Sequence, residues 1–170
     1  RVRLAARQAA QRQRMIETKL ANAMNDPLFQ TLTIGHVTFK NRFMSTSHAC
    51  GLKEGGLPKE RYQRYHEEKA KGGIGMTMFG GSSNVAPDSP SVFQQLYVGD
   101  DNVIPYLQQF SERIHAHGTA IMCQITHLGR RGEPYASNWL PTIGPSPIRE
   151  TLHRSFPKEM DVDDIDRVVR

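Results

Sequence analysis

The chain has 170 residues, enough for one domain with a hydrophobic core, and a formal net charge of +5 with a sequence pI of about 9.4. The charge excess lies entirely in residues 1–24, so residues 25–170 are formally neutral and give no reason to expect nucleic-acid binding. Two cysteines supply neither a disulfide framework nor a metal-ligand spacing. No stretch is apolar enough to span a membrane, and we expect a cytoplasmic chain without a metal site.

The N-terminal extension, residues 1–24, is rich in Arg, Ala and Gln. It is upstream sequence before a true start at Met15 or Met24, a helical arm, or a targeting peptide, although its lack of serine argues against the last. The first residue is not methionine and the chain stops inside a predicted helix, so we expect a fragment of a longer protein. Residues 25–170 should form the domain itself.

A hairpin and a strand are the first elements predicted after this extension. Residues 31–40, TLTIGHVTFK, alternate apolar and polar residues around a Gly-His pair, which predicts a short β-hairpin. Residues 41–47, NRFMSTS, predict the first strand of a sheet.

A helix and a second strand follow. Residues 57–73 predict a helix that ends at a glycine pair and whose inner face includes Tyr62, Tyr65 and Ala70. Residues 74–81, IGMTMFGG, form an apolar run without alternation, typical of a strand covered on both sides, and a polar loop is expected from residue 82.

The last elements repeat this order. Residues 100–118 predict a helix with apolar residues at helical spacing, which are Ile104, Leu107, Phe110 and Ile114. Residues 119–127 predict the third strand, and residues 128–160 a long loop. Asp161 is the expected N-cap of a final helix.

The alternation of buried strands with helices indicates parallel βα units, in either a barrel or a doubly wound sheet. In a (β/α)8 barrel the active site gathers at the carboxyl ends of the strands. Three apolar runs here end in small or polar residues, at 45–48, 80–83 and 124–127. Strand alternation places Gln124 on the side of Met122 and turns Ile121 and Cys123 to the helices.

These strand ends suit a flat heteroaromatic ligand. The Gln124 carboxamide both donates and accepts hydrogen bonds, as the edge of such a ring requires. Glycines at 80 and 81 should let the ligand approach the backbone closely. The methionines on the predicted strands are expected to fill the barrel; they are Met44, Met76, Met78 and Met122.

The same segments resemble a known family. NRFMSTSHACG after a hairpin, a Gly-Gly strand end and QITHLGRRG are similar to the N-terminal half of the Old Yellow Enzyme-like NADH:flavin oxidoreductases, from about residue 26 to 170. The resemblance implies a (β/α)8 TIM barrel, of which this chain is the hairpin and the first three βα units. It is strongest to the branch with 2,4-dienoyl-CoA reductase, trimethylamine dehydrogenase and the N-methylproline or dimethylglycine demethylases.

The resemblance implies FMN over the barrel mouth. Its isoalloxazine ring would contact Ser47, His48 and Ala49, largely through backbone, with Gly81 and Gln124 at the pyrimidine edge. The catalytic residues are expected beyond residue 170. Within the chain, His127 and Arg130 are candidates for substrate or flavin contact, with bracing of the loop as the equal alternative.

The family activity expected is oxidative N-demethylation of a small N-methylated amino acid by hydride transfer to flavin. The alternative is NAD(P)H-dependent reduction of an activated C=C bond, of the enoate or dienoyl-CoA reductase type. Relatives in this branch carry a [4Fe–4S] cluster and a second nucleotide-binding domain downstream. A small-molecule substrate is expected, without nucleic-acid or membrane partners, and a homo-oligomer of the full-length protein is left open.

The sequence departs from its relatives at two positions near the expected flavin, and two other functions compete with the flavin enzyme. Ala49 stands where some relatives have a cysteine beside the flavin, so a covalent cysteinyl-flavin is not expected, and Gly81 replaces an aromatic residue of the trimethylamine cage. A metal-dependent barrel hydrolase would use His48 and His127. A non-enzymatic protein would use residues 1–24 as a nucleic-acid tether, shown by salt-dependent DNA binding.

Overall fold

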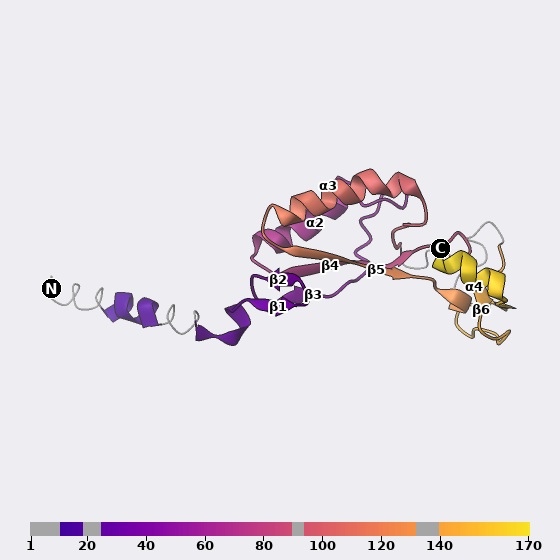
Figure 1. Cartoon of the computed structure of the whole chain (residues 1–170), viewed down its shortest axis with the longest axis horizontal. Coiled ribbons are helices and arrows are strands. Elements are labelled where there is room, and N and C mark those ends of the chain that lie inside the picture. The colour runs from indigo at the N-terminus through magenta and orange to yellow at the C-terminus, as the bar shows by residue number, and fades with distance from the viewer. Residues whose placement is uncertain (1–10, 19–24, 90–93, 132–139) are drawn as a thin grey trace.

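The structure is a computed structural model that describes residues 11–18, 25–89, 94–131 and 140–170. Its centre is a three-stranded parallel sheet in the order β3-β4-β5 (Figure 1). The strands are β3 (Met44–Ser45), β4 (Met76–Asn84) and β5 (Ala120–Thr126). All three predicted strands are therefore present, and their parallel pairing confirms the predicted βα order.

Two helices lie side by side on one face of this sheet (Figure 1). Helix α2 (Glu60–Lys71) follows β3, and α3 (Ile104–His115) follows β4 after the 3-10 turn η2 (Asp101–Val103). Both were predicted, and α3 carries a proline in its first turn, where the missing N–H is not needed.

The predicted hairpin is confirmed as β1 (Leu32–Ile34) paired antiparallel with β2 (Val37–Phe39), after the 3-10 turn η1 (Pro27–Phe29). Gly35 lies in the turn at φ +59°, a left-handed conformation that glycine adopts without strain. In the described part of the N-terminal extension, residues 11–18 are helical and exposed. Within the described ranges, no helix combines the length and apolar character needed to cross a bilayer.

The segment after β5 contains more structure than the predicted loop. Residues 128–160 hold a 3-10 turn and two short strands that pair in parallel; these are η3 (Gly129–Arg131), β6 (Ile143–Gly144) and β7 (Lys158–Glu159). The predicted final helix follows as α4 (Val162–Val169). The predicted N-cap of α4 is confirmed, because the Asp161 carboxylate accepts from the Asp164 N–H at 2.9 Å and the Asp164 carboxylate accepts from the Asp161 N–H. This reciprocal capping box satisfies backbone donors at the helix start.

The hydrophobic core lies between the sheet and the two helices. Phe110 and Ile114 of α3 are fully buried, and Phe110 packs edge-on against Phe79 of β4 with ring centroids 4.9 Å apart. The prediction that Ile104 belongs to this face is wrong, because its side chain is 45% exposed. Val103, in the turn before the helix, is buried instead, so the apolar face starts one residue earlier than the helical spacing suggested.

The opposite face of the sheet is open in this chain. Ile121 and Cys123 of β5 pack against the core cluster, as strand alternation predicted. Met44 and Met122, on the side without helices, are 48% and 47% exposed. Gln124 is exposed as well, which agrees with its predicted side.

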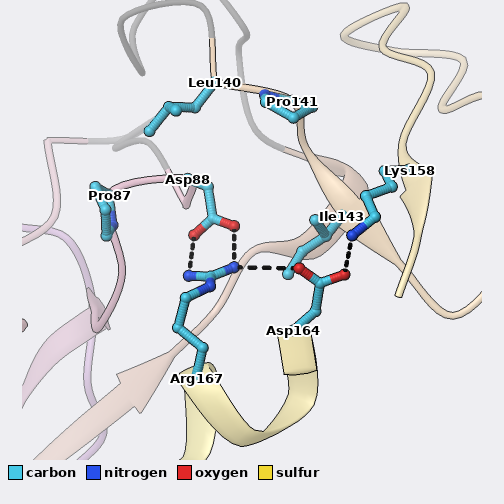
Figure 2. Close-up of a pocket in the computed structure, with 8 residues that line it drawn as sticks. All are labelled: Pro87, Asp88, Leu140, Pro141, Ile143, Lys158, Asp164 and Arg167. Atoms are coloured by element: carbon cyan, nitrogen blue, oxygen red, sulfur yellow. Dashed lines mark hydrogen bonds and ion pairs between the residues drawn. The ribbon is translucent and has the colours of Figure 1, made fainter. Parts of the chain in front are cut away.

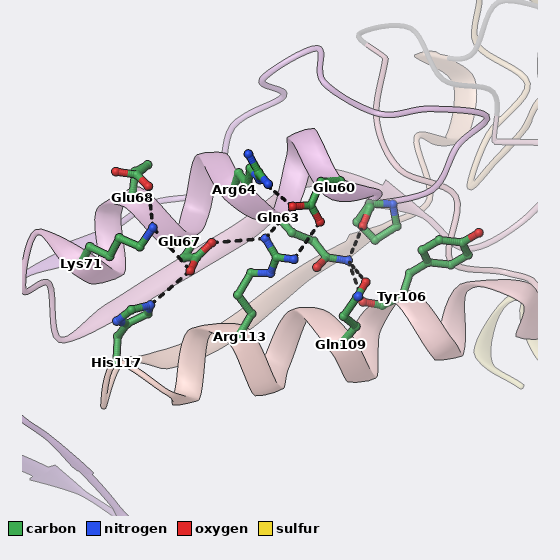
Figure 3. Close-up of polar contacts among 11 residues, drawn as sticks. Glu60, Gln63, Arg64, Glu67, Glu68, Lys71, Tyr106, Gln109, Arg113 and His117 are labelled. Carbon is green, nitrogen blue, oxygen red and sulfur yellow. Dashed lines mark hydrogen bonds and ion pairs between the residues drawn. The ribbon is translucent and has the colours of Figure 1, made fainter.

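Polar contacts hold α2 against α3 (Figure 3). Arg113 of α3 bonds both Glu60 and Glu67 of α2, at 2.7 and 3.2 Å. Deeper in the same seam, the fully buried Gln63 donates to the Pro58 carbonyl at 3.0 Å and to the Gln109 side chain at 3.1 Å. Because α2 is held along its length, the side chains that it turns to the sheet have fixed positions.

Candidate functional site

The glycine pair of β4 forms a bulge within the strand. Gly80, Gly81 and Ser82 all have positive φ, at 107°, 54° and 77°, and the pairing with β5 shifts register between Phe79 and Ser83. The prediction that the strand ends at the glycines is therefore wrong, since β4 continues to Asn84. A bulge bends a strand and re-aims its side chains, and such bulges are common beside active sites.

The two glycines permit close contact between neighbouring backbones. A Cβ on Gly81 would collide with the backbone of His48 and Ala49, and one on Gly80 would lie 2.7 Å from the Gln124 carbonyl oxygen. The absence of a Cβ on each glycine thus lets the two flanking segments approach the bulged strand closely. The bulge draws the three predicted polar segments together, and close approach of a ligand to these glycines stays a prediction.

The side chains of Ser47 and Gln124 meet beside the bulge, and we call this contact the junction. The Ser47 hydroxyl donates to Oε1 of Gln124, which joins the segment after β3 to β5 across the bulged strand between them. The Gln124 Nε2 has no hydrogen bond among the residues that the structure describes. The amide therefore presents an unused donor on the open face of the sheet.

Two tyrosines of α2 contact the bulge and its flanking segment from the helix-covered face of the sheet. The Tyr62 hydroxyl accepts from the Gly80 N–H at 3.0 Å, and burial raises the pKa of this phenol. One turn later, the Tyr65 hydroxyl lies 2.7 Å from Nε2 of His48, which is exposed on its other side. Both tyrosines were predicted only as inner-face residues of the helix, yet Tyr62 contacts the bulge itself and Tyr65 contacts the flanking segment that contains His48.

His66 completes this row on α2. Its Nδ1 is 2.8 Å from the Thr77 hydroxyl, which is 3.0 Å from the Ser45 hydroxyl on β3. Burial lowers the pKa of His66 to about 3, so its ring is neutral at physiological pH, and its buried Nε2 lacks a partner in the described ranges. The sequence analysis missed this residue, although its helical spacing from Tyr62 and Ala70 placed it on the inner face, where a polar ring needs a partner.

His127 and Arg130 occupy a second polar cluster. The His127 Nδ1 accepts from the Gly129 N–H at 3.0 Å, so its Nε2 donates to Asp88, 3.2 Å away. Arg130 donates to the Ile148 carbonyl at 3.3 Å. Both ring nitrogens of His127 are thus used within the chain, which supports the bracing interpretation; a catalytic role stays a prediction.

Asp88 joins this cluster to α4, and Figure 2 shows its ion pair with Arg167 of that helix. Arg167 donates to both carboxylate oxygens of Asp88, at 3.2 and 2.7 Å, beside a pocket of about 340 Å³. Asp164 bonds Lys158 at 2.7 Å in the same pocket. Each charge that lines the pocket is therefore paired, and in the described part of the chain no His, Cys, Asp and Glu side chains gather as a metal site.

The residues at the bulge fit the FMN that the family resemblance implies. A free carboxamide donor and an exposed imidazole edge, beside the closely packed backbone of residues 47–49 and 80–81, match the donors needed at N1 and O2 of an isoalloxazine ring. Ser47, His48, Ala49, Gly81 and Gln124 are all brought together by the fold. These residues would hold the ring, while Tyr62 and Tyr65 would hold these residues.

Two curated proteins are similar to this chain over most of its length. A multifunctional alkene reductase/demethylase OYE of Caballeronia cordobensis is 59% identical over 151 residues, which are 89% of this chain and 22% of the relative. A probable N-methylproline demethylase of Rhizobium meliloti (strain 1021) is 44% identical over 146 residues, 86% of this chain and 22% of that protein. The chain thus spans about a fifth of the length of these relatives.

Solved structures show the same fold. Morphinone reductase in complex with tetrahydroNAD superposes with a TM-score of 0.74 at 20% identity, over 84% of this chain and 43% of that one. The old yellow enzyme homologue of Zymomonas mobilis gives 0.72 at 18% identity, over 84% and 42%. The hairpin and the three βα units are therefore the N-terminal portion of a (β/α)8 TIM barrel, which decides between the barrel and the doubly wound sheet.

The NADH:flavin oxidoreductase / NADH oxidase family pattern matches residues 27–170, the segment that contains the hairpin, the bulge and the junction of Ser47 with Gln124. This chain belongs to the NADH:flavin oxidoreductase / NADH oxidase family.

Proposed function

We propose that the whole protein is an FMN-dependent oxidoreductase that demethylates a small N-methylated amino acid. The carrying observation is the convergence of residues 47–49, the bulge at Gly80-Gly81 and Gln124 at one point on the open face of the sheet. Two relatives above 40% identity are named as demethylases or as demethylase and reductase, which supports this substrate class.

When bound, FMN would supply a hydride acceptor for oxidation of the substrate's N-methyl group. The oxidised substrate would be an iminium ion, which water would hydrolyse to formaldehyde and the demethylated amine. In this chain, the Gln124 amide and the backbone of Ser47, His48 and Ala49 orient the ring and stabilise negative charge on its pyrimidine side. We propose that residues outside this chain supply the catalytic groups, and that NAD(P)H and a [4Fe–4S] cluster are further cofactors of the whole protein.

The second candidate function is NAD(P)H-dependent reduction of an activated C=C bond. It is favoured by the name of the relative at 59% identity, which covers both alkene reduction and demethylation. Both reactions use the same flavin and differ in the direction of hydride transfer. The residues of this chain serve either reaction in the same way.

The absorption spectrum of the purified full-length protein tests the flavin. A yellow protein that releases FMN on denaturation is expected, and a colourless protein that does not bind added FMN would refute the proposed function. Formaldehyde release from N-methylproline or dimethylglycine then tests demethylation, and NADH consumption with an activated alkene tests the second candidate.

Replacement of Gln124 by leucine tests the assigned site. Gln124→Leu keeps the volume but removes the carboxamide, which should weaken FMN binding by about 1–3 kcal/mol. The loss should be larger for the reduced, anionic flavin, because hydrogen bonds to charged groups are stronger. We expect weaker FMN retention and a two-electron potential lower by tens of millivolts, since about 30 mV corresponds to ~1.4 kcal/mol.

Met122→Leu is the matched control, because it changes the same face of β5 without altering a polar group. It should retain the wild-type potential. A Gln124→Leu protein with wild-type affinity and potential would show that this amide does not contact the flavin.

A further inference from the structure

Among the described residues, the Tyr65 side chain is the hydrogen-bond partner of the exposed His48 imidazole. The Tyr65 hydroxyl is 2.7 Å from His48 Nε2, and the two rings meet edge-on with centroids 5.6 Å apart. His48 Nδ1 has no hydrogen bond among the described residues. One ring nitrogen of His48 is therefore tied to α2, and the other is available.

The Tyr65 ring is itself fixed on α2. It packs edge-on against the buried ring of His66 with centroids 5.2 Å apart, and the Lys69 ammonium lies 4.3 Å from its centroid. Two neighbours on the same helix thus restrict the ring, and α2 is anchored to α3 through Gln63 and Arg113. These contacts give the Tyr65 hydroxyl a defined position.

The hydrogen bond between Tyr65 and His48 can run in either direction, because the roles of the ring nitrogen depend on the histidine tautomer. In the described part of the chain, His48 Nε2 is the one protein acceptor within reach of the Tyr65 hydroxyl, which favours donation from the phenol to that nitrogen. Burial raises the pKa of Tyr65, which keeps the phenol protonated and able to donate. A neutral His48 whose Nε2 accepts a hydrogen bond carries its proton on Nδ1.

We propose that Tyr65 is a positioning residue of the flavin site, which holds His48 in the Nδ1–H tautomer and so presents one fixed N–H donor from the segment whose backbone packs against Gly81. This inference rests on the proposed function. It adds a residue that lies on a helix behind the barrel and acts only through His48. The ligand atom that this donor suits is an electron-rich oxygen or nitrogen, which gains negative charge when a flavin is reduced.

The test is Tyr65→Phe in the full-length flavoprotein, which removes only the hydroxyl. The reduced flavin should lose about tenfold more affinity than the oxidised flavin, and the two-electron potential should fall by about 30 mV. Tyr106→Phe is the matched control, because this tyrosine of α3 has no hydrogen bond from its hydroxyl within the described ranges. The control should keep the wild-type potential.

A double-mutant cycle with His48→Ala separates positioning from a general structural effect. The Tyr65→Phe shift should disappear in the His48→Ala background, because no imidazole remains to be held. An equal shift in both backgrounds, or no shift in either while FMN is bound, overturns the proposal. A protein that binds no FMN in any form refutes the proposed function instead, so the two failures are distinguishable.

The histidine tautomer provides a measurement that needs no flavin. With ¹⁵N-labelled histidine, the His48 signal is identified by its loss in His48→Ala. Wild type should show the Nδ1–H tautomer, and Tyr65→Phe should shift His48 toward the Nε2–H form. An Nε2–H tautomer in the wild-type protein would overturn the proposal even if Tyr65→Phe loses FMN.

Discussion

Two packing interfaces of this molecule, here called the aromatic seam and the charged seam, hold polar loops in place by different contacts. The aromatic seam, where α2 and α3 pack on β4, is built from buried rings, with Phe110, Phe79 and Tyr62 around the neutral His66. The seam between the loop after β4 and α4 is built from charges, with Arg167 and His127 both bonded to Asp88. The aromatic seam supports the candidate flavin site, and the charged seam supports the long segment that follows β5.

The comparison indicates which kind of contact fixes the position of a side chain more tightly in this fold. Aromatic rings packed at 5–6 Å leave little freedom, so a hydroxyl on such a ring holds a strand end at a defined point. An ion pair at the protein surface tolerates more movement and depends on pH and salt, and the Arg167 side chain is 45% exposed. We therefore expect the two seams to fail under different conditions.

The largest expected effect is the loss of the aromatic seam in Phe110→Ala. Its ring is fully buried against Tyr62, His66 and Phe79, so truncation should cost about 3–5 kcal/mol of unfolding free energy. Thermal and urea unfolding of the full-length protein, followed by circular dichroism and flavin release, measures the loss. Ile104→Ala, at an exposed position of the same helix, should cost under about 1 kcal/mol; equal losses in both variants would contradict the assignment of the core.

The second prediction concerns acid sensitivity of the aromatic seam. Burial lowers the pKa of His66 to about 3, whereas an unfolded histidine titrates near 6.5, so the unfolded state binds a proton that the folded state refuses. Unfolding free energy should therefore decrease as the pH falls below about 6.5, by about 2 kcal/mol at pH 5. His66→Phe should flatten this dependence between pH 7 and pH 5.

His115→Gln, which alters an exposed histidine of α3, is the control for that measurement and should leave the slope unchanged. Urea unfolding at several pH values gives the slopes. If His66→Phe keeps the wild-type slope, the aromatic seam is not the source of the acid sensitivity.

The smallest predicted effect belongs to the charged seam. Burial alone would raise the pKa of Asp88, but hydrogen bonds from Arg167 and His127 outweigh burial and hold the pKa below its ordinary value. The stabilisation is thus present at neutral pH and is lost only as the pH falls below about 4. Asp88→Asn should cost about 1–2 kcal/mol at pH 7 and raise hydrogen exchange in residues 127–129 and α4.

Asp101→Asn provides the comparison for Asp88→Asn, because Asp101 is exposed and has no side-chain ion pair in the described part of the chain. It should leave both stability and exchange near wild type. Faster exchange at the bulge of β4 in Asp88→Asn would show that the two seams are coupled rather than independent.

Much of the fold followed from local patterns. The hairpin has alternation and a Gly-containing turn, α4 has a capping aspartate, and the parallel strands are unbroken apolar runs, all of which depend on neighbours in sequence. The same local rules misplaced Ile104 and the end of β4. A turn of 3-10 helix before α3 and a bulge at Gly80-Gly81 changed the spacing at those points.

By itself, the sequence determined the order of elements, the family and the residues at which polar groups follow apolar strands. Only the tertiary structure decided how those groups meet, because the contacts join residues far apart in the chain. The bulge packs Gly81 against His48 and Ala49, and the Ser47 hydroxyl reaches Gln124 across β4. Likewise, Tyr65 and His66 have helical spacing that predicts burial, but their polar partners exist only once α2 lies on the sheet.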